Sequence, residues 1–233
     1  MTRFTRGTAL FGLSLLGLTT RLEGQVFGLP VRNAGVPTGL TLAADFGFPN
    51  GEAGKGWAVG ASGTLGLGPL GVTGSVARWD PRGDANSFSS LGATVNLKIF
   101  GGPLIPLSVT AQGGFAYGRQ EFEVTTAPGG TTTEHETFWR LPLGVGFALT
   151  IPNPVLAIKP WVAPRIDVAT TGVDFVGGSG TSTETNFGVS GGIDLSFLSG
   201  LGIRAMYDRV WAGDGVNPGI LSLGVSWGLT VGR

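Results

Sequence analysis

The last stretch of the chain constrains the fold more than any other segment. From Leu221 to Gly232, every odd-numbered position is large and apolar, and every even-numbered position is Gly, Ser or Thr. Successive side chains of a β-strand point to opposite faces, so this segment predicts a strand with one apolar face and one smooth polar face. The same alternation recurs along nearly the whole chain, which indicates a closed β-barrel in a membrane.

The composition excludes several other classes of protein. The chain has 233 residues, with 43 Gly, no Cys, 42% hydrophobic residues and 13% charged residues. Disordered chains have low hydrophobicity and high charge, which is the opposite balance. The net charge is zero, and no basic stripe is present, so we expect no nucleic-acid partner. The absence of Cys fits an oxidising compartment and a fold without disulfides.

Ten segments carry the alternating pattern, and each is long enough for a tilted strand to cross the hydrocarbon layer. The predicted strands are 40–48, 57–67, 70–79, 88–100, 107–122, 137–150, 158–169, 186–197, 202–211 and 220–231. We therefore predict an all-β fold, a closed antiparallel up-and-down transmembrane β-barrel of ten strands. A barrel of eight strands is the alternative, but it would discard two well-formed alternating segments.

The connections between these strands alternate in length. The short ones are 68–71, 101–106, 151–156 and 198–201, and the long polar ones are 49–56, 80–87, 123–136, 170–185 and 212–219. Outer-membrane barrels have short periplasmic turns and longer external loops. Ten strands place both chain ends on the side of the short turns, which agrees with that arrangement.

Residue size predicts which face of the barrel is outside. A soluble lipocalin-like barrel has apolar side chains inside and a charged exterior. Here the non-apolar face of the strands is mostly Gly, Ser, Ala and Thr. Such residues do not make a soluble exterior but suit a narrow lumen. We therefore expect the bulky aliphatic face to contact lipid and the small-residue face to line the lumen.

The amino terminus has the pattern of a secretion signal. Arg3 and Arg6 precede an apolar run over residues 7–18, which is too short for a transmembrane helix. A buried helix or a first strand is the alternative for this run. We predict a cleaved signal peptide over 1–24, a short periplasmic segment over 25–37, and the barrel over 38–233.

In these features the chain resembles the small bacterial outer-membrane β-barrel proteins. The resemblance is carried by the signal-like start, the runs 140–147 (RLPLGVGF) and 159–165 (KPWVAPR), and the alternating final strand. It implies a location in the bacterial outer membrane, contact with its lipid and lipopolysaccharide, and insertion by the barrel-insertion machinery. Proteins of this class usually end on an aromatic residue, whereas this chain ends on Arg233 and its last aromatic residue is Trp227. We expect a monomer without a cofactor.

Eight charged residues fall in the lumen-facing phase of the strands: Asp45, Lys98, Arg140, Arg165, Asp167, Asp194, Arg204 and Asp208. A charge facing lipid is costly, so these side chains are expected to point inward, where they can pair. The main hypothesis is an ion-pair network that fills the lumen. A selectivity constriction in a small pore and a catalytic carboxylate pair are the alternatives.

Aromatic residues near strand ends predict interfacial girdles. The candidates are Trp57, Tyr117, Trp139, Tyr207 and Trp211. Three further aromatic residues, Trp79, Phe138 and Trp161, fall in the lumen phase and are candidates for lumen plugs. Arg78 falls in the outward phase at the outer rim. There it either meets lipopolysaccharide phosphates or extends to water.

Catalytic and metal-binding signals are weak. His135 is the only histidine and lies between two glutamates in the long connection 123–136. We predict a solvated loop residue, because one His without a second His or a Cys is a poor metal-ligand set. Omptin-type outer-membrane proteases also have ten strands, but no matching acid–His motif is present. We therefore predict a non-enzymatic structural or surface-interaction protein. A narrow porin-like channel and an omptin-like surface hydrolase are the alternatives.

Overall fold

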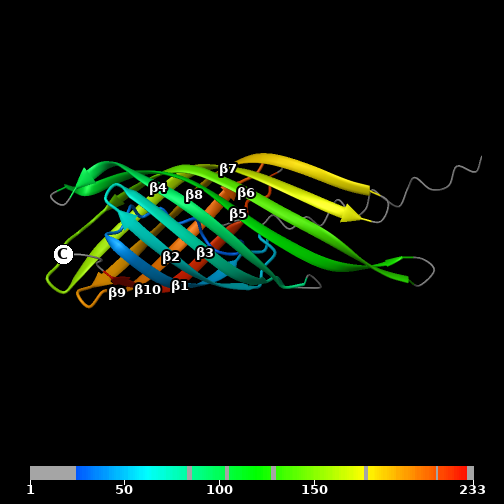
Figure 1. Ribbon diagram of the computed structural model, residues 1–233, viewed down its shortest axis with the longest axis horizontal. Helices are drawn as coiled ribbons and strands as arrows, with labels where there is room; N and C mark the ends of the chain where they lie inside the picture. Colours follow the sequence, from blue (N-terminus) through cyan, green and yellow to red (C-terminus); the bar gives the residue numbers. More distant parts are fainter. Residues whose placement is uncertain are drawn as a thin grey trace, which may run out of the picture.

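The computed structural model describes residues 25–82, 86–102, 105–126, 130–175, 178–213 and 215–229. Ten strands form one closed barrel (Figure 1). The strands are β1 (Gly39–Pro49), β2 (Trp57–Leu67), β3 (Leu70–Asp80), β4 (Phe88–Gly102), β5 (Ile105–Thr126), β6 (Gly130–Leu149), β7 (Leu156–Phe175), β8 (Gly178–Phe197), β9 (Leu201–Trp211) and β10 (Gly219–Leu229). The prediction of ten strands is confirmed, and the eight-strand alternative is wrong.

Every strand pairs antiparallel with its neighbours in the chain, and β1 pairs with β10 to close the sheet. At the closing seam Ala44 lies opposite Val225. A closed up-and-down barrel leaves no exposed sheet edge in the membrane, which is the condition for a β-structure to cross lipid. Within the described ranges, no helix is long and apolar enough to span a membrane.

The two faces of the wall are as predicted. Large apolar side chains point outward around the barrel, for example Val76, Leu143 and Val225, which are 58%, 56% and 60% exposed. The alternate positions are buried inside, as Ser75 and Ala77 are on either side of Val76. An exposed apolar belt of this extent on a soluble protein would drive association, so its natural surroundings are acyl chains.

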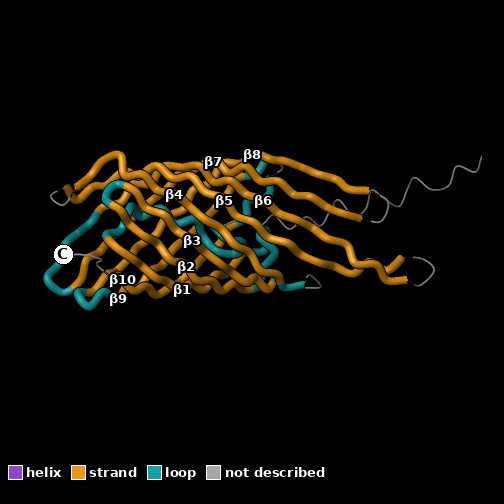
Figure 2. Tube along the Cα trace, viewed as in Figure 1, coloured by secondary structure: helices purple, strands orange, loops and turns teal. Residues whose placement is uncertain are grey.

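Two of the predicted external loops are mostly paired strand. The connections 123–136 and 170–185 were expected to be loops because they are polar, but β5–β6 and β7–β8 continue through them as long hairpins (Figure 2). Thr favours β-structure, and cross-strand Thr pairs hydrogen-bond. The hydroxyls of Thr170 and Thr183 lie 3.0 Å apart in this way. The residues of these segments are polar because solvent contacts both faces of the hairpins. Their polarity does not mean that the strands are unpaired.

The segment 25–37 does not lie in the periplasm, so that prediction is wrong. It runs through the interior of the barrel (Figures 1 and 2), and Phe27 and Val31 are fully buried there. The small lumen residues make room for it. A Cβ atom on Gly47 would lie 2.2 Å from the carbonyl oxygen of Gly28, and one on Gly146 would lie 2.4 Å from that of Asn33. The predicted signal peptide, residues 1–24, lies outside the described residues.

Candidate functional site

The candidate site is the lumen together with residues 25–37, which we call the lumen plug. The plug begins at Gln25 beside the middle of β3 and turns at Gly28 against Trp79 in the outer half of the barrel, the half nearer the long connections. It then descends to Pro37, which lies beside Gly66 at the periplasmic end. Its polar groups bind the wall: the Gln25 amide donates to Ser75 Oγ at 3.0 Å, and the Asn33 amide donates to the Thr110 carbonyl at 3.2 Å. Gln112 of β5 donates to the Arg32 carbonyl at 2.8 Å.

An aromatic cluster closes the outer half of the lumen around the plug. Phe27 contacts Phe88 and Phe138, with ring centroids 6.1 Å and 5.8 Å apart, and Trp79 packs edge-on against Phe88 at 5.5 Å. The structure thus brings two of the three predicted lumen aromatics, Trp79 and Phe138, onto the plug. The third, Trp161, is also buried but belongs to a separate cluster.

A chain of buried ion pairs runs along the inside of the wall from β6 to β9, beside the plug. Arg140 donates to Asp167 at 2.6 Å, Arg165 donates to the same carboxylate at 2.8 Å, and the other end of Arg165 donates to Asp208 at 2.7 Å. All four side chains are only 1% exposed. The second Asp208 oxygen accepts the backbone N–H of Val31 at 2.8 Å. The chain therefore ends on the plug itself.

A second ion pair holds the plug at Asp194. Arg32 of the plug donates to this carboxylate, and Trp161 Nε1 donates to its other oxygen at 3.3 Å. In register, Lys159 of β7 and Arg204 of β9 lie on either side of Asp194. Sequence reasoning missed Arg32, because a segment without alternation gives no sign that it enters the lumen. It also missed Lys159, although its position shares the inward phase of Arg165 and could have been found.

The remaining predicted lumen charges are Arg204, Asp45 and Lys98. Arg204 of β9 reaches across β10 and pairs with Asp45 of β1. The residue between them is Gly224, where a Cβ atom would lie 2.0 Å from an Asp45 oxygen. Glycine at this position therefore allows the pair to form. Lys98 is half-buried and forms no ion pair with any described residue.

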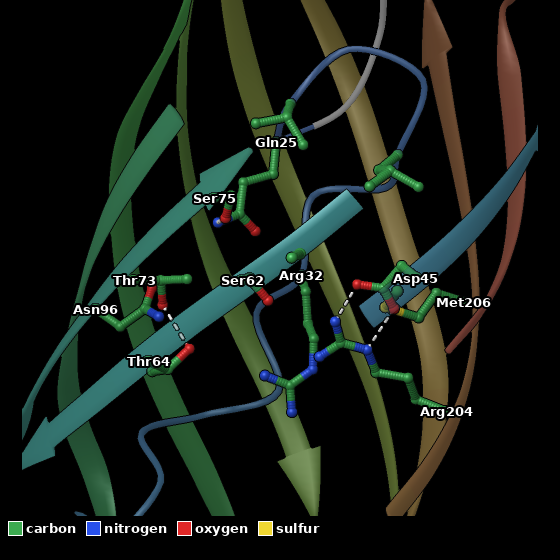
Figure 3. Close-up of a pocket in the computed structure, with 13 residues that line it drawn as sticks. Gln25, Arg32, Asp45, Ser62, Thr64, Thr73, Ser75, Asn96, Arg204 and Met206 are labelled. Atoms are coloured by element: carbon green, nitrogen blue, oxygen red, sulfur yellow. Dashed lines mark hydrogen bonds and ion pairs between the residues drawn. The ribbon is translucent and has the colours of Figure 1, made fainter. Parts of the chain in front are cut away.

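A small polar cavity remains between the plug and the wall (Figure 3). Its volume is about 30 Å³, and its lining includes Arg32, Arg204, Thr64 and Thr73, with the two Thr hydroxyls 2.9 Å apart. This space is enough for about two water molecules. The plug, the aromatic cluster and the ion pairs all lie in the interior, next to the small lumen residues.

The five predicted girdle residues all lie on the outward face in the outer half of the wall. Tyr117 and Trp139 are opposite each other on β5 and β6, with ring centroids 4.7 Å apart. Trp57 stacks on Phe46 at 5.8 Å. The exposed fractions of Tyr207 and Trp211 are 46% and 43%. Amphipathic rings in such positions suit the boundary between acyl chains and headgroups.

His135 is not a loop residue, which corrects the prediction. It lies on β6 opposite Glu121 of β5, and its Nδ1 is 3.4 Å from the Glu121 carboxylate. The side chain is 33% exposed. Among the residues that the structure describes, no group of three His, Cys, Asp or Glu side chains is placed to hold a metal ion.

A match to a known family accompanies this architecture. Residues 27–228 match the family described as outer membrane protein beta-barrel domain. The chain belongs to this family. It is a transmembrane β-barrel protein of the bacterial outer membrane. The match begins at Phe27, so it includes most of the lumen plug as well as the strands. A search of curated proteins finds no match.

Several solved structures are similar to the chain at low sequence identity. Neisserial surface protein A is 15% identical, with a TM-score of 0.39 over 82% of this chain and 98% of that chain. The attachment invasion locus protein Ail of Yersinia pestis is 14% identical, with a TM-score of 0.42 over 82% of this chain and 99% of that chain. The outer membrane protease OmpT from Escherichia coli is 7% identical, with a TM-score of 0.42 over 82% and 93%.

Proposed function

We propose that this protein is a non-enzymatic, non-conducting barrel that carries the β5–β6 and β7–β8 hairpins on the cell surface for interaction with other molecules. The observation that carries the proposal is the lumen plug, which is tied to the wall by buried charged groups. A barrel of ten strands lined by Gly and Ser could otherwise leave a narrow channel. In this chain that space is occupied.

The energetics of the plug oppose the porin-like alternative. Solute passage would require the plug to leave, which separates Arg32 from Asp194 and the Val31 N–H from Asp208. Breaking a buried charge contact costs about 3–5 kcal/mol when one partner stays behind unpaired. The cavity of about 30 Å³ beside the plug holds about two water molecules and no larger solute.

The geometry of the hairpins supports a role in surface interaction. The pairing of β8 with β9 begins at Phe187, so residues 178–186 pair only with β7 within the described part of the chain. All nine of these residues except Asn186 are exposed. Within the described part of the chain this segment therefore has a strand on one side only, and partner proteins bind strand edges by adding a strand.

Conductance in planar bilayers tests the closed lumen. We expect the full chain to be silent and a variant that lacks residues 25–37 to conduct, because the deletion removes the plug and keeps β1. Heat-modifiable migration in detergent gels serves as the folding control for both proteins. Steady conductance by the full chain would contradict the proposal.

Proteolysis of intact cells tests the exposed hairpin. Glu184 lies on the exposed part of β8, so a glutamate-specific protease added outside the cell should cleave after it. The matched control is Glu184→Gln, in which this fragment should disappear while cleavage elsewhere is unchanged. If the site is cut only after the cells are lysed, the hairpin does not face the medium and the surface role is wrong.

A further inference from the structure

Charged side chains on the outward face of the strands are distributed unevenly between the two ends of the barrel. Toward the outer end, three strands carry an arginine on the outward face: Arg78 on β3, Arg119 on β5 and Arg209 on β9, the last of these between the exposed rings of Tyr207 and Trp211. At the periplasmic end of the same strands the outward positions are Leu70, Leu107 and Leu201. Among the residues that the structure describes, these outward-facing arginines therefore lie toward the outer end of the barrel, where anionic headgroups of the outer leaflet would lie.

Two of these arginines converge on one place. Arg78 is opposite Ser89 of β4, and Arg119 follows Gly118, the last β5 residue that pairs with β4. The Arg78 guanidinium donates to Ser87 Oγ at 2.5 Å. Ser87 and Arg119 line the same open hollow of about 330 Å³ at the outer rim. Arg119 of β5 and Ser87, the residue before β4, thus line the hollow, and Arg78 of β3 reaches its edge through the hydrogen bond to Ser87.

Two hydrogen bonds next to the hollow join the segment before β4 to β5, beyond the end of the β4–β5 ladder. The Asn86 amide donates to the Glu121 carbonyl at 2.9 Å, and the Gln120 amide donates to the Asn86 carbonyl at 2.8 Å. Glu121 is the acidic side chain that lines the hollow. Its carboxylate is 3.4 Å from His135 Nδ1 on the opposite strand, so it is directed toward β6.

We propose that this hollow, which we call the rim site, binds a phosphate group on the headgroup of an outer-leaflet glycolipid. Arginine forms planar, charge-assisted hydrogen bonds that match phosphate geometry, and two arginines with a Ser hydroxyl can surround one phosphate. The surface below the rim site favours a lipid over a free anion. Val76, Leu91 and Phe115 are exposed there on the same three strands and offer a path for acyl chains.

Native mass spectrometry of the full chain in detergent micelles tests the rim site with three probes: bisphosphorylated lipid A, fully dephosphorylated lipid A, and inorganic phosphate. We expect the first lipid to bind at least about tenfold more tightly than the second, the loss typical of one or two charge-assisted hydrogen bonds. The double variant Arg78→Gln/Arg119→Gln should lose this preference. Arg82→Gln is the matched control, since it removes the same charge from the same rim outside the hollow.

Each result either supports or overturns the rim site. Equal binding of the two lipids by the native chain overturns it even if the double variant does not fold. A folded double variant that keeps the preference for the phosphorylated lipid also overturns it, as does an equal loss in Arg82→Gln. Complete competition by inorganic phosphate at the concentration of the lipid shows that the occupant is a free anion and refutes the lipid assignment.

Discussion

Asp167 is the residue whose replacement tests the lumen network most directly. Its carboxylate accepts hydrogen bonds from Arg140 at 2.6 Å and from Arg165 at 2.8 Å, and all three side chains are 1% exposed. Asp167→Asn keeps the shape of the side chain but removes the charge that both guanidinium groups share. One amide oxygen remains as an acceptor, so part of the hydrogen bonding survives.

The expected cost is about 3 kcal/mol, the lower end of the range for a buried ion pair that loses one partner. Urea unfolding in detergent micelles, followed by tryptophan fluorescence, measures this loss. With an unfolding slope of about 1–3 kcal/mol per M, the midpoint should fall by about 1–3 M. Asp174→Asn is the matched control, because Asp174 is exposed on the outer part of β7 and its replacement should change stability by less than about 0.5 kcal/mol.

Two results would refute this reasoning. A loss of unfolding free energy below about 1 kcal/mol would be the value typical of solvent-screened surface ion pairs. Such a value would be inconsistent with the burial of Asp167. A change in single-channel conductance without a change in stability would mean that the carboxylate lines a conducting path. The ion-pair network would then form a constriction in a pore and would not fill the lumen.

Three further predictions address the plug, the seam and the lipid face. Gly146→Val places side-chain atoms where Asn33 of the plug lies and should destabilise the barrel by about 1–3 kcal/mol and raise conductance, as measured by urea unfolding and in planar bilayers. Gly224→Ala places a methyl group 2.0 Å from an Asp45 oxygen. We expect the free energy of unfolding to fall by about 1–3 kcal/mol in the same assay, and an unchanged midpoint would contradict the ion pair between Arg204 and Asp45 at the β1–β10 seam. Leu143→Arg puts a charge on the lipid face and should cost about 2–4 kcal/mol, whereas a stability equal to that of the native chain would mean that this face is not in the acyl layer.

Much of the barrel was predictable because strand alternation is a local property. The strand that begins at Trp57 is recognised from its own residues, since period-two patterning places each side chain on one face whatever the partner. The inward phase of Asp45 and Asp208 follows in the same way. The ends of β5 to β8 were not predictable from alternation, because a strand with solvent on both faces has no apolar side to mark it.

The partner of each lumen charge was not predictable, since phase alone does not say which strands meet across the interior. Asp45 pairs with Arg204, 159 positions away, and it does so across β10 because the intervening residue is Gly224. Ring closure between β1 and β10 brings these groups together. The position of Lys159 was accessible from its phase, whereas that of Arg32 was not.

The amino-acid sequence by itself determined the ten strands, the face that each residue takes and the location of the chain in an outer membrane, because all three depend on short-range periodicity and residue size. Only the tertiary structure decided that residues 25–37 enter the lumen. The plug is held by contacts between distant positions, such as the Val31 N–H and Asp208, which are 177 residues apart. A segment of this kind carries no periodic signal, and its place depends on the closed wall around it.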